Sequence, residues 1–377
     1  MHLVLIVGAR PNFMKIAPIM RALTKFSKVR MTLIHTGQHY DPNLSDVFFK
    51  ELGIAAPDIS LDVGSGSHGK QTADVLVGVE KVLQDFHLQG NPVTRLVVVG
   101  DVNSTMAATL AAAKLNIPVA HVEAGLRSGD RTMPEEINRI VTDSICDMLL
   151  VSEPDGVVNL RREGHPDKNI YLVGNVMIDT LLHQVTAAKG LSTLENFQLT
   201  PQRYGVVTLH RPSNVDHPES LQRLVQVLCD ISHRMKIVFP VHPRTRRRLE
   251  EFGLWQELND SPNVVCLPPL GYLEFLCLTS QAQAIVTDSG GLQEESTALG
   301  VPCLTMRENT ERPITVSEGT STLIGGDIEK LKRYLSEIID GKYKQGRCPE
   351  LWDGQAAERI SRILCNQPVK PMPPEKS

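Results

Sequence analysis

Short apolar runs alternate with longer segments of helical period along most of the chain. In the first half, we expect strands near residues 2–7, 29–36, 95–99, 118–122, 148–151 and 170–173. Between them, helical periodicity is found near residues 12–25, 43–52, 68–85, 104–115, 134–146 and 155–163. This alternation predicts βαβ units that build a parallel, doubly wound sheet.

The same pattern restarts after a looser region near residues 174–203. Further strands are expected near residues 204–209, 236–239, 264–267, 284–287 and 302–305. We therefore expect an α/β protein with two Rossmann-like domains, residues 1–175 and 176–353, which face each other across a ligand-binding cleft. A last helix near residues 354–366 should cross back to complete the first domain, and the Pro-rich tail 367–377 should be flexible.

Composition narrows the class of protein. The 377 residues exceed what one hydrophobic core usually serves, which agrees with two domains. With 39 Lys and Arg against 43 Asp and Glu, the net charge of -4 favours neither nucleic acid nor a membrane as a partner. The seven cysteines lack disulfide or metal-ligand spacing, so we expect a reduced, cytoplasmic protein without a metal site. The apolar start is too short to span a bilayer and is expected to be the first strand.

Carboxylates gather at two predicted strand ends of the first half. The charged stretch 121–143 directly follows a strand and contains Glu123 and Glu135, while Asp101 follows the strand before it. The carboxyl ends of parallel strands bind ligands in open α/β sheets. Neighbouring carboxylates repel each other, so at least one pKa should be raised, which suits proton transfer near neutral pH. For Asp101 alone, a helix-capping role is an equal alternative.

Candidate anion-binding groups follow the first strand, in GARPNFMKIAP. Arg10 can donate two hydrogen bonds to an anion, and Lys15 lies one helical turn further on. A turn with solvated cations would have the same sequence. Neither a GKS or GKT sequence nor GxGxxG is present, so a P-loop and a nicotinamide-binding fold are unsupported.

The second half contains a sequence typical of diphosphate binding. In DSGGLQEE a strand ends and a helix begins at once, so backbone N–H groups and a hydroxyl can surround a diphosphate at Ser289, Gly290 and Gly291. Glu295 in the first turn can accept hydrogen bonds from ribose hydroxyls, and Arg312 lies in the polar loop after the next strand. His210, at another strand end, could act on the substrate, although a lone histidine is as often structural.

Together these strings resemble the non-hydrolysing UDP-N-acetylglucosamine 2-epimerases, which have the two-domain glycosyltransferase-B fold. The resemblance runs through GARPNFMKIAP, TGQH, GDVNST, HVEAGLRSGDRTMPEEINR, GNVMID, TLHRPSN, VHPR, DSGGLQEE and RENTERP. It implies a cofactor-free inversion of C2 that converts UDP-GlcNAc to UDP-ManNAc for cell-surface polysaccharides. In that family UDP is eliminated, a 2-acetamidoglucal forms, and UDP adds back.

The resemblance also implies roles for single residues and a homodimeric assembly. By motif position, the catalytic residues are Asp101, Glu123, Glu135 and His210. The UDP-sugar contacts are Arg10, Lys15, Phe275, Ser289, Gly290, Gly291, Glu295 and Arg312. Which carboxylate serves which face of the sugar stays open.

Other features leave alternatives to a simple epimerase. Gln38, His39, Gln71 and His242 resemble an allosteric UDP-GlcNAc pocket found in bacterial members. Lys70 stands where the family usually has Arg, and HRPSN departs from the usual HRREN, so allostery and the exact sugar stay open. A hydrolysing epimerase, an epimerase of a UDP-diacetamido-uronic acid, and a glycosyltransferase are the competing hypotheses.

Overall fold

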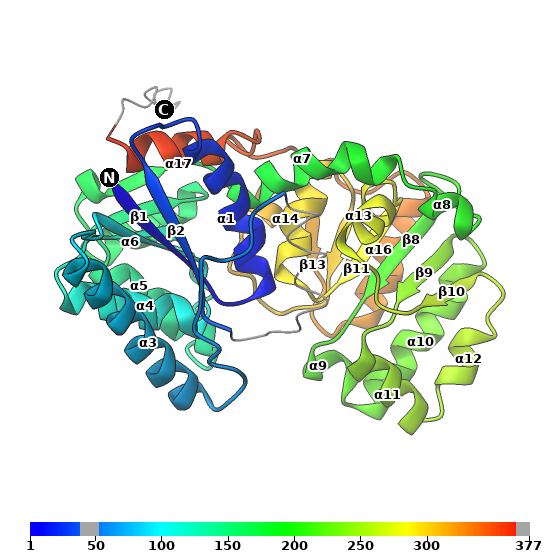
Figure 1. Ribbon diagram of the computed structural model, residues 1–377. Helices are drawn as coiled ribbons and strands as arrows, with labels where there is room; N and C mark the ends of the chain where they lie inside the picture. The colour runs from blue at the N-terminus through cyan, green and yellow to red at the C-terminus, as the bar shows by residue number, and fades with distance from the viewer. Residues whose placement is uncertain (38–52, 367–377) are drawn as a thin grey trace. The chain divides into compact units, whose positions relative to one another are not determined.

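The chain forms two compact α/β units, each with its own parallel sheet (Figure 1). The computed structural model describes residues 1–37 and 53–366, apart from the side chain of Arg10. Unit 1 comprises Met1–Thr180 and the chain from Glu350 onward, and unit 2 comprises Leu181–Pro349. The predicted fold class, α/β with two parallel sheets, is confirmed.

Seven parallel strands form the sheet of unit 1, in the order β3-β2-β1-β4-β5-β6-β7. Their bounds are β1 His2–Val7, β2 Arg30–His35, β3 Ile59–Ser60, β4 Arg95–Val99, β5 Val119–Ala124, β6 Met148–Val151 and β7 Ile170–Leu172. The chain adds strands on one side of β1 and then continues with β4 on its other side. Ligands bind at the carboxyl ends of strands where the order reverses in this way.

The helices of unit 1 cover its sheet. They are α1 Arg10–Leu23, α3 His68–Leu88, α4 Asn103–Lys114, α5 Pro134–Ile145, α6 Pro154–Arg162, the short 3₁₀ turn η1 Asp167–Asn169 and α17 Ala356–Leu364. The helix expected near residues 43–52 lies outside the described residues. Most buried residues of the sheet are aliphatic, as in a sheet covered on both faces.

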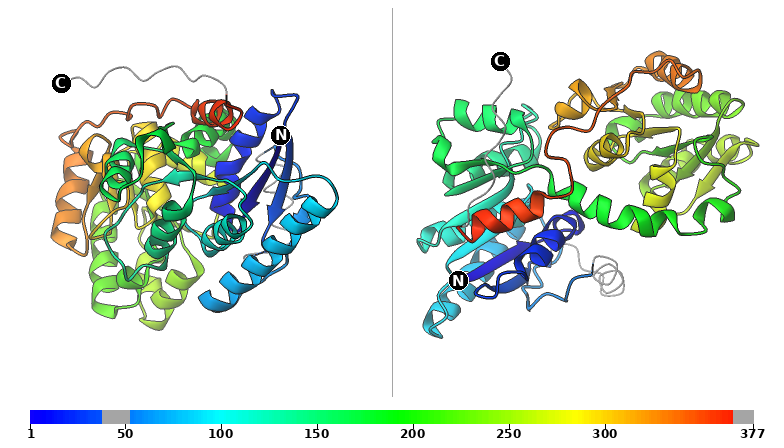
Figure 2. Two further views of the ribbon diagram at one scale, coloured as in Figure 1. Left: turned by 90° about the vertical axis from the view of Figure 1, so that its left-hand side faces the viewer. Right: turned by 90° about the horizontal axis from the view of Figure 1, so that it is seen from above.

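The last helix belongs to unit 1, although residues 181–349 separate it from the rest of that unit in the sequence. Figures 1 and 2 show α17 alongside α1, and Lys25 Nζ lies 2.8 Å from Glu358 Oε2. The Asp179 carboxylate accepts hydrogen bonds from the N–H groups of Ala356 and Ala357, which stabilises the amino end of α17. The returning segment is thus held by specific contacts.

The expectation of a loose region after residue 174 was wrong. A 14-residue helix, α7 Val176–Lys189, occupies it, followed by α8 Thr193–Asn196. Met177, Leu181, Gln184 and Ala188 recur at helical spacing and are buried. The helical period was therefore present, but a buried glutamine in place of an apolar residue hid it.

Unit 2 repeats the architecture with six parallel strands in the order β10-β9-β8-β11-β12-β13. Their bounds are β8 Tyr204–Thr208, β9 Lys236–Pro240, β10 Val264–Leu267, β11 Ala284–Thr287, β12 Cys303–Thr305 and β13 Ser321–Leu323. Here the order reverses between β8 and β11. The short strands β3 and β13 were not predicted, because their sequences, IS and STL, each contain a single apolar residue and so show no apolar run.

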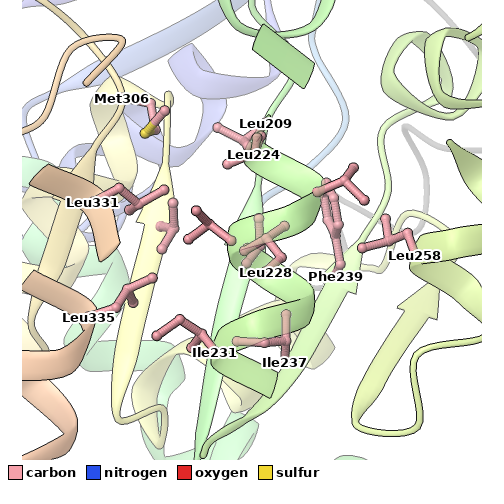
Figure 3. Close-up of a cluster of buried hydrophobic side chains, with 14 of the residues drawn as sticks. Leu209, Leu224, Leu228, Ile231, Ile237, Phe239, Leu258, Met306, Leu331 and Leu335 are labelled. Atoms are coloured by element: carbon pink, nitrogen blue, oxygen red, sulfur yellow. The ribbon is translucent and has the colours of Figure 1, made fainter. Parts of the chain in front are cut away.

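The core of unit 2 lies between its sheet and two long helices. The helices are α9 Pro212–Val215, α10 Pro218–Ser232, α11 Pro243–Glu251, α12 Trp255–Asn259, α13 Tyr272–Ser280, α14 Gly290–Leu299, α15 Ile314–Ser317 and α16 Ile328–Ile339. Figure 3 shows Leu224 and Leu228 of α10 and Leu331 and Leu335 of α16 in one apolar cluster. This packing fixes the positions of the β8 and β11 ends.

The cysteines and the apolarity of the helices bear on the class of protein. All seven cysteines are free thiols, and three of them are buried, as expected for small core residues. No helix within the described ranges is both long and apolar enough to cross a membrane.

Candidate active site

Glu123 stands on an irregularity in β5. The pairing of β5 with β6 shifts its register between Val122 and Ala124, and Glu123 between them has φ 73°. For a residue other than glycine, this left-handed conformation costs about 1–3 kcal/mol. Bulges of this kind often redirect a side chain near an active site. The strain therefore supports a functional role for Glu123.

The ends of β1, β4 and β5 converge around the Glu123 carboxylate. Glu123 is buried and forms an ion pair with Lys15 of α1. Asn12, one turn earlier in α1, donates to the carbonyl oxygen of Val99 at 3.0 Å. A methyl group added at Gly100 would lie 3.2 Å from Lys15 Nζ and 3.9 Å from Glu123 Oε2. Only a residue without a side chain leaves this space open.

Asp101 lies in the turn after β4 and is held by α5. Its Oδ2 lies 2.5 Å from Arg139 Nη1, and its carbonyl oxygen accepts a hydrogen bond from Asn138 at 2.8 Å. The Asp101 side chain keeps 30% of its surface exposed, whereas that of Arg139 keeps 3%. Asp101 and Glu123 thus have separate cations, Arg139 and Lys15, which offset the mutual repulsion expected from the sequence.

The two adjacent glutamates of α5 have different environments. Glu136 is buried and accepts hydrogen bonds from the N–H groups of Ser128 and Gly129, both at 3.0 Å, and pairs with Arg139. Burial acts to raise the pKa of Glu136, but these donors and Arg139 bring it below its usual range. Glu135, one residue earlier, is exposed. Glu136 therefore shapes the loop after β5, while Glu135 is accessible to a ligand.

In unit 2, His210 is held by Asp288, a buried residue that directly follows β11. Asp288 accepts hydrogen bonds from the N–H groups of His210 and Arg211, at 3.0 and 2.8 Å, and from Asn214 Nδ2 at 3.0 Å. Its Oδ1 also lies 2.9 Å from His210 Nδ1. Burial acts to raise the pKa of Asp288, but His210 and these donors lower it. The His210 side chain is 43% exposed, so its outer edge can meet a ligand.

The basic start of α11 is neutralised within unit 2. Arg244 and Arg248 both pair with Asp216, at 2.5 and 3.0 Å. His242 begins the helix by accepting a hydrogen bond from the N–H of Arg244, and its ring centroid lies 5.5 Å from that of His210. Burial and the neighbouring charge of His210 lower the pKa of His242. The His242 ring, which lies beside His210, therefore takes up a proton less readily than a free histidine.

The predicted diphosphate-binding turn lies beside a dense network of charges. Arg312 contacts Glu294 and Glu311, both at 2.7 Å, and Arg307 contacts Glu311 at 2.8 Å. A methyl group at Gly290 would lie 2.9 Å from Glu311 Oε1, whereas one at Gly291 would meet nothing within 4 Å. Ser289 precedes the first turn of α14 and is half-buried. The structure thus brings Ser289, Gly290 and Arg312 together.

Glu295, the expected ribose contact, faces α13. It is buried, and the Tyr272 hydroxyl lies 3.5 Å from its Oε1. Burial, with a smaller contribution from Glu294, raises the pKa of Glu295 to about 7. Phe275 lies one turn after Tyr272 on α13 and is half-buried.

Other predicted site residues are placed separately. Gln71 is buried on α3, where its Oε1 accepts a hydrogen bond from Asn103 at 3.1 Å, and its neighbour Lys70 pairs with Asp74. Gln38, His39 and the side chain of Arg10 lie outside the described residues. Gln71 belongs to unit 1 and His242 to unit 2. Within residues 1–37 and 53–366, no group of three His, Cys, Asp or Glu side chains could hold a metal ion.

Several residues that hold the site in place were not predicted from the sequence to do so. Asn12, His121, Asp143 and Asp288 contact the strand ends or their side chains. Each is a polar residue inside or beside an apolar strand or helix face, which is a recognisable signal. The partners of such residues come from distant segments, so spacing alone does not identify them.

Known proteins resemble this chain in sequence and fold over nearly its whole length. The family model described as UDP-N-acetylglucosamine 2-epimerase matches residues 21–365. A UDP-N-acetylglucosamine 2-epimerase of Methanocaldococcus jannaschii is 43% identical over 97% of this chain and 99% of its own. Its crystal structure in complex with UDP-GlcNAc and UDP matches with a TM-score of 0.84, covering 97% of this chain and 100% of that chain. A UDP-2,3-diacetamido-2,3-dideoxy-D-glucuronate 2-epimerase of Pseudomonas aeruginosa is 39% identical, over 97% of this chain and 99% of its own.

Proposed function

The chain belongs to the UDP-N-acetylglucosamine 2-epimerase family and is a sugar-nucleotide epimerase, and from this premise we propose its substrate and mechanism. We propose that it interconverts UDP-GlcNAc and UDP-ManNAc. UDP is eliminated with loss of the C2 proton, and it adds back to a 2-acetamidoglucal with protonation on the other face. The product would supply precursors of cell-surface polysaccharide.

One observation carries this proposal: the Glu123 carboxylate, on a strained bulge, lies beside the turn that holds Asp101. A C2 hydrogen next to an acetal is a weak acid, so its removal must be coupled to departure of UDP. Inversion then requires proton donors and acceptors on both faces of the sugar. Two carboxylates on neighbouring strand ends, with Glu135 exposed nearby in sequence, provide such groups.

The cations and helix ends support the leaving group in this proposal. Developing negative charge on UDP is stabilised by preorganised donors and cations. In unit 2, the amino end of α14 with Ser289 and Arg312 is suited to a diphosphate. His210, oriented by Asp288, is kept as the fourth catalytic residue. No metal or added cofactor is needed for these steps.

A second substrate is favoured by one specific observation. The relative that is 39% identical is named for UDP-2,3-diacetamido-2,3-dideoxy-D-glucuronate, and the one that is 43% identical for UDP-N-acetylglucosamine. Sequence identity therefore does not separate the two substrates. We therefore keep epimerisation of such a UDP-diacetamido-uronic acid as the alternative. A uronate adds a carboxylate at C6, and its recognition would require another cation.

The proposal is tested by proton NMR in heavy water. With UDP-GlcNAc, we expect deuterium at C2 and a mixture of two intact UDP-sugars, because each turnover exchanges the C2 proton. Glu123→Gln should lower this exchange by about 10²–10⁴-fold while UDP still binds. Glu219→Gln, an exposed glutamate on α10, is the matched control and should exchange normally.

Each contrary result has a distinct meaning. Accumulation of free ManNAc and UDP would indicate a hydrolysing epimerase. No exchange with UDP-GlcNAc but rapid exchange with the diacetamido-uronate would assign the alternative substrate. Normal turnover of Glu123→Gln would remove Glu123 from the mechanism, and transfer of the sugar to an acceptor would indicate a glycosyltransferase.

The finer expectations on assembly and location are part of the same proposal. We propose a cytoplasmic homodimer, as is usual in the resembled family. Sedimentation of the full chain at micromolar concentration should give the mass of two copies, and a single-copy mass would contradict it.

A further inference from the structure

We propose that His121 and Asp143 form a buried positioning pair, which holds the Glu123 bulge and the Asp101 turn in fixed relation to each other. The proposal rests on the proposed function only through the roles of Glu123 and Asp101. Neither His121 nor Asp143 is a candidate for contact with substrate, because both side chains have no exposed surface.

Asp143 contacts the chain on both sides of Glu123. Its Oδ1 lies 2.6 Å from His121 Nδ1, and its Oδ2 accepts a hydrogen bond from the N–H of Gly125 at 3.0 Å. His121 and Gly125 are two residues before and two residues after Glu123. Asp143 belongs to α5, so a single carboxylate from this helix fixes both ends of the strained segment.

His121 extends the same link to β4. Its second nitrogen, Nε2, lies 2.8 Å from the carbonyl oxygen of Gly100, the residue directly before Asp101. Gly100 has φ 69°, so the turn that presents Asp101 is bent at this carbonyl. His121 therefore joins the end of β4 to α5 through the body of β5.

The two contacts of His121 define its chemical form. A carbonyl oxygen and an ionised carboxylate can only accept hydrogen bonds, so the ring must donate from both nitrogens. Only the imidazolium carries both protons. Burial acts to raise the pKa of Asp143, but His121 and Arg127 lower it, which keeps the carboxylate ionised. A neutral ring would give up one of the two contacts.

An ordinary core role does not account for this pair. Replacing a buried ion pair by apolar residues of similar volume is often neutral or stabilising, so burial alone does not favour two charges here. The rest of β5 before Glu123 is apolar and pairs with β4 through its backbone. The two charged side chains instead lie between the ends of β4 and β5, which carry the proposed catalytic carboxylates Asp101 and Glu123. There they contact both strand ends.

The predicted consequence is a loss of turnover with little change in substrate binding. In Asp143→Asn the NH₂ group faces either His121 Nδ1, which must then lose its proton, or the Gly125 N–H, which then loses its acceptor, so the link to one flank of the bulge is weakened or released. Small displacements of a reacting group can lower the rate by about 10²-fold. We expect kcat to fall by about that factor, while KM for UDP-GlcNAc changes little. Asp143→Glu, which keeps the charge, should retain more activity than Asp143→Asn.

The experiment combines kinetics with ¹⁵N NMR of the full chain labelled at histidine. His121 should show two protonated ring nitrogens at pH 7 in the wild type and one in Asp143→Asn, with its signal assigned by its loss in His121→Gln. Asp147→Asn is the matched control. Asp147 accepts a hydrogen bond from the N–H of Val119 at 2.8 Å, at the opposite end of β5, so its substitution should change neither kcat nor the His121 signal.

The outcomes separate this proposal from the proposed function. Wild-type kcat in a folded Asp143→Asn, or a singly protonated His121 in the wild type, would overturn the positioning pair. An equal loss of kcat in Asp147→Asn would show that any substitution at the ends of β5 has the same effect, which also overturns it. If the wild type does not act on UDP-GlcNAc, the proposed function fails, and the His121 protonation states decide the pair. Where Asp143→Asn does not fold, Asp143→Glu and the wild-type signal decide it.

Discussion

At the scale of the residue, the pKa values of two buried carboxyl groups of unit 2 are shifted in opposite directions. Both side chains are buried: Asp288 directly follows β11, and Glu295 lies in α14, the next helix. Asp288 receives several N–H donors and the His210 ring, which lower its pKa. At Glu295, burial and the charge of the adjacent Glu294 outweigh the hydrogen bond from the Tyr272 hydroxyl and raise its pKa to about 7. The number of donors, not the depth of burial, decides the direction.

Glu295 should therefore make the stability of unit 2 depend on pH. Its pKa is raised in the folded state, so folding holds a proton that the unfolded chain releases, and the free energy of unfolding falls as pH rises through about 7. Between pH 5 and pH 8, this group should cost the wild type roughly 3 kcal/mol. Glu295→Gln should lack that loss, so calorimetry should find the variant stabilised relative to wild type at pH 8 more than at pH 5.

The matched control is Glu257→Gln, an exposed glutamate on α12 of the same unit. Relative to wild type, its unfolding temperature should change by the same amount at pH 5 and at pH 8. An equal shift for Glu295→Gln would show that Glu295 is ionised in both states, and its environment would need another explanation.

At the scale of the element, the turn between β1 and α1 packs closely against the start of α4. A methyl group at Gly8 would lie 2.4 Å from Ser104 Oγ and 2.7 Å from Ser104 Cβ. Gly8 and the adjacent Ala9 donate their N–H groups to Asn12, which fixes the start of α1. The starts of α1 and α4 thus approach more closely than two side chains would allow. Lys15, which pairs with Glu123, lies further along the same helix α1.

Gly8→Ala should destabilise unit 1 by about 1–3 kcal/mol, because the added methyl overlaps Ser104. Ser104→Gly removes the opposing side chain, so the double variant should recover part of that loss. A double-mutant cycle by denaturant unfolding measures the coupling. Additive effects would show that Gly8 is required for its backbone and not for its contact with Ser104.

At the scale of the whole molecule, unit 1 is built from two segments that are far apart in the sequence. The chain leaves unit 1 after Thr180 and returns at Glu350. Trp352 in the returning segment is buried and its Nε1 donates to the carbonyl oxygen of Ser152 at 3.3 Å. The stability of unit 1 therefore depends on residues that follow all of unit 2 in the sequence.

Trp352→Ala should destabilise unit 1 by about 3–5 kcal/mol, the usual cost of removing a large buried aromatic side chain. Hydrogen exchange followed by mass spectrometry should show faster exchange in peptides of β5 and α5 and little change in those of α10. Phe239→Ala, a buried aromatic of β9, is the counterpart and should give the reverse pattern. Equal acceleration in both units for Trp352→Ala would contradict the assignment of the segment to unit 1.

Much of the fold follows from the sequence pattern because parallel strands are continuous apolar runs between helical periods. The bounds of β1, β4, β6, β10 and β11 agree with the predicted ranges. The helix α7 was not predicted because polar residues share its buried face. The strands β3 and β13 were not predicted because each contains a single apolar residue, Ile59 or Leu323, and so shows no apolar run.

The sequence by itself determined the fold class, the family and the residue types at the strand ends, because apolar periodicity and contiguous motifs are local properties of the chain. It placed Glu123 at a strand end, but not on a bulge with positive φ. Only the tertiary structure decided that Lys15 pairs with Glu123, Arg139 with Asp101, and Asp143 with both flanks of the bulge. These contacts join segments on different strands and helices, and their existence depends on how those elements pack.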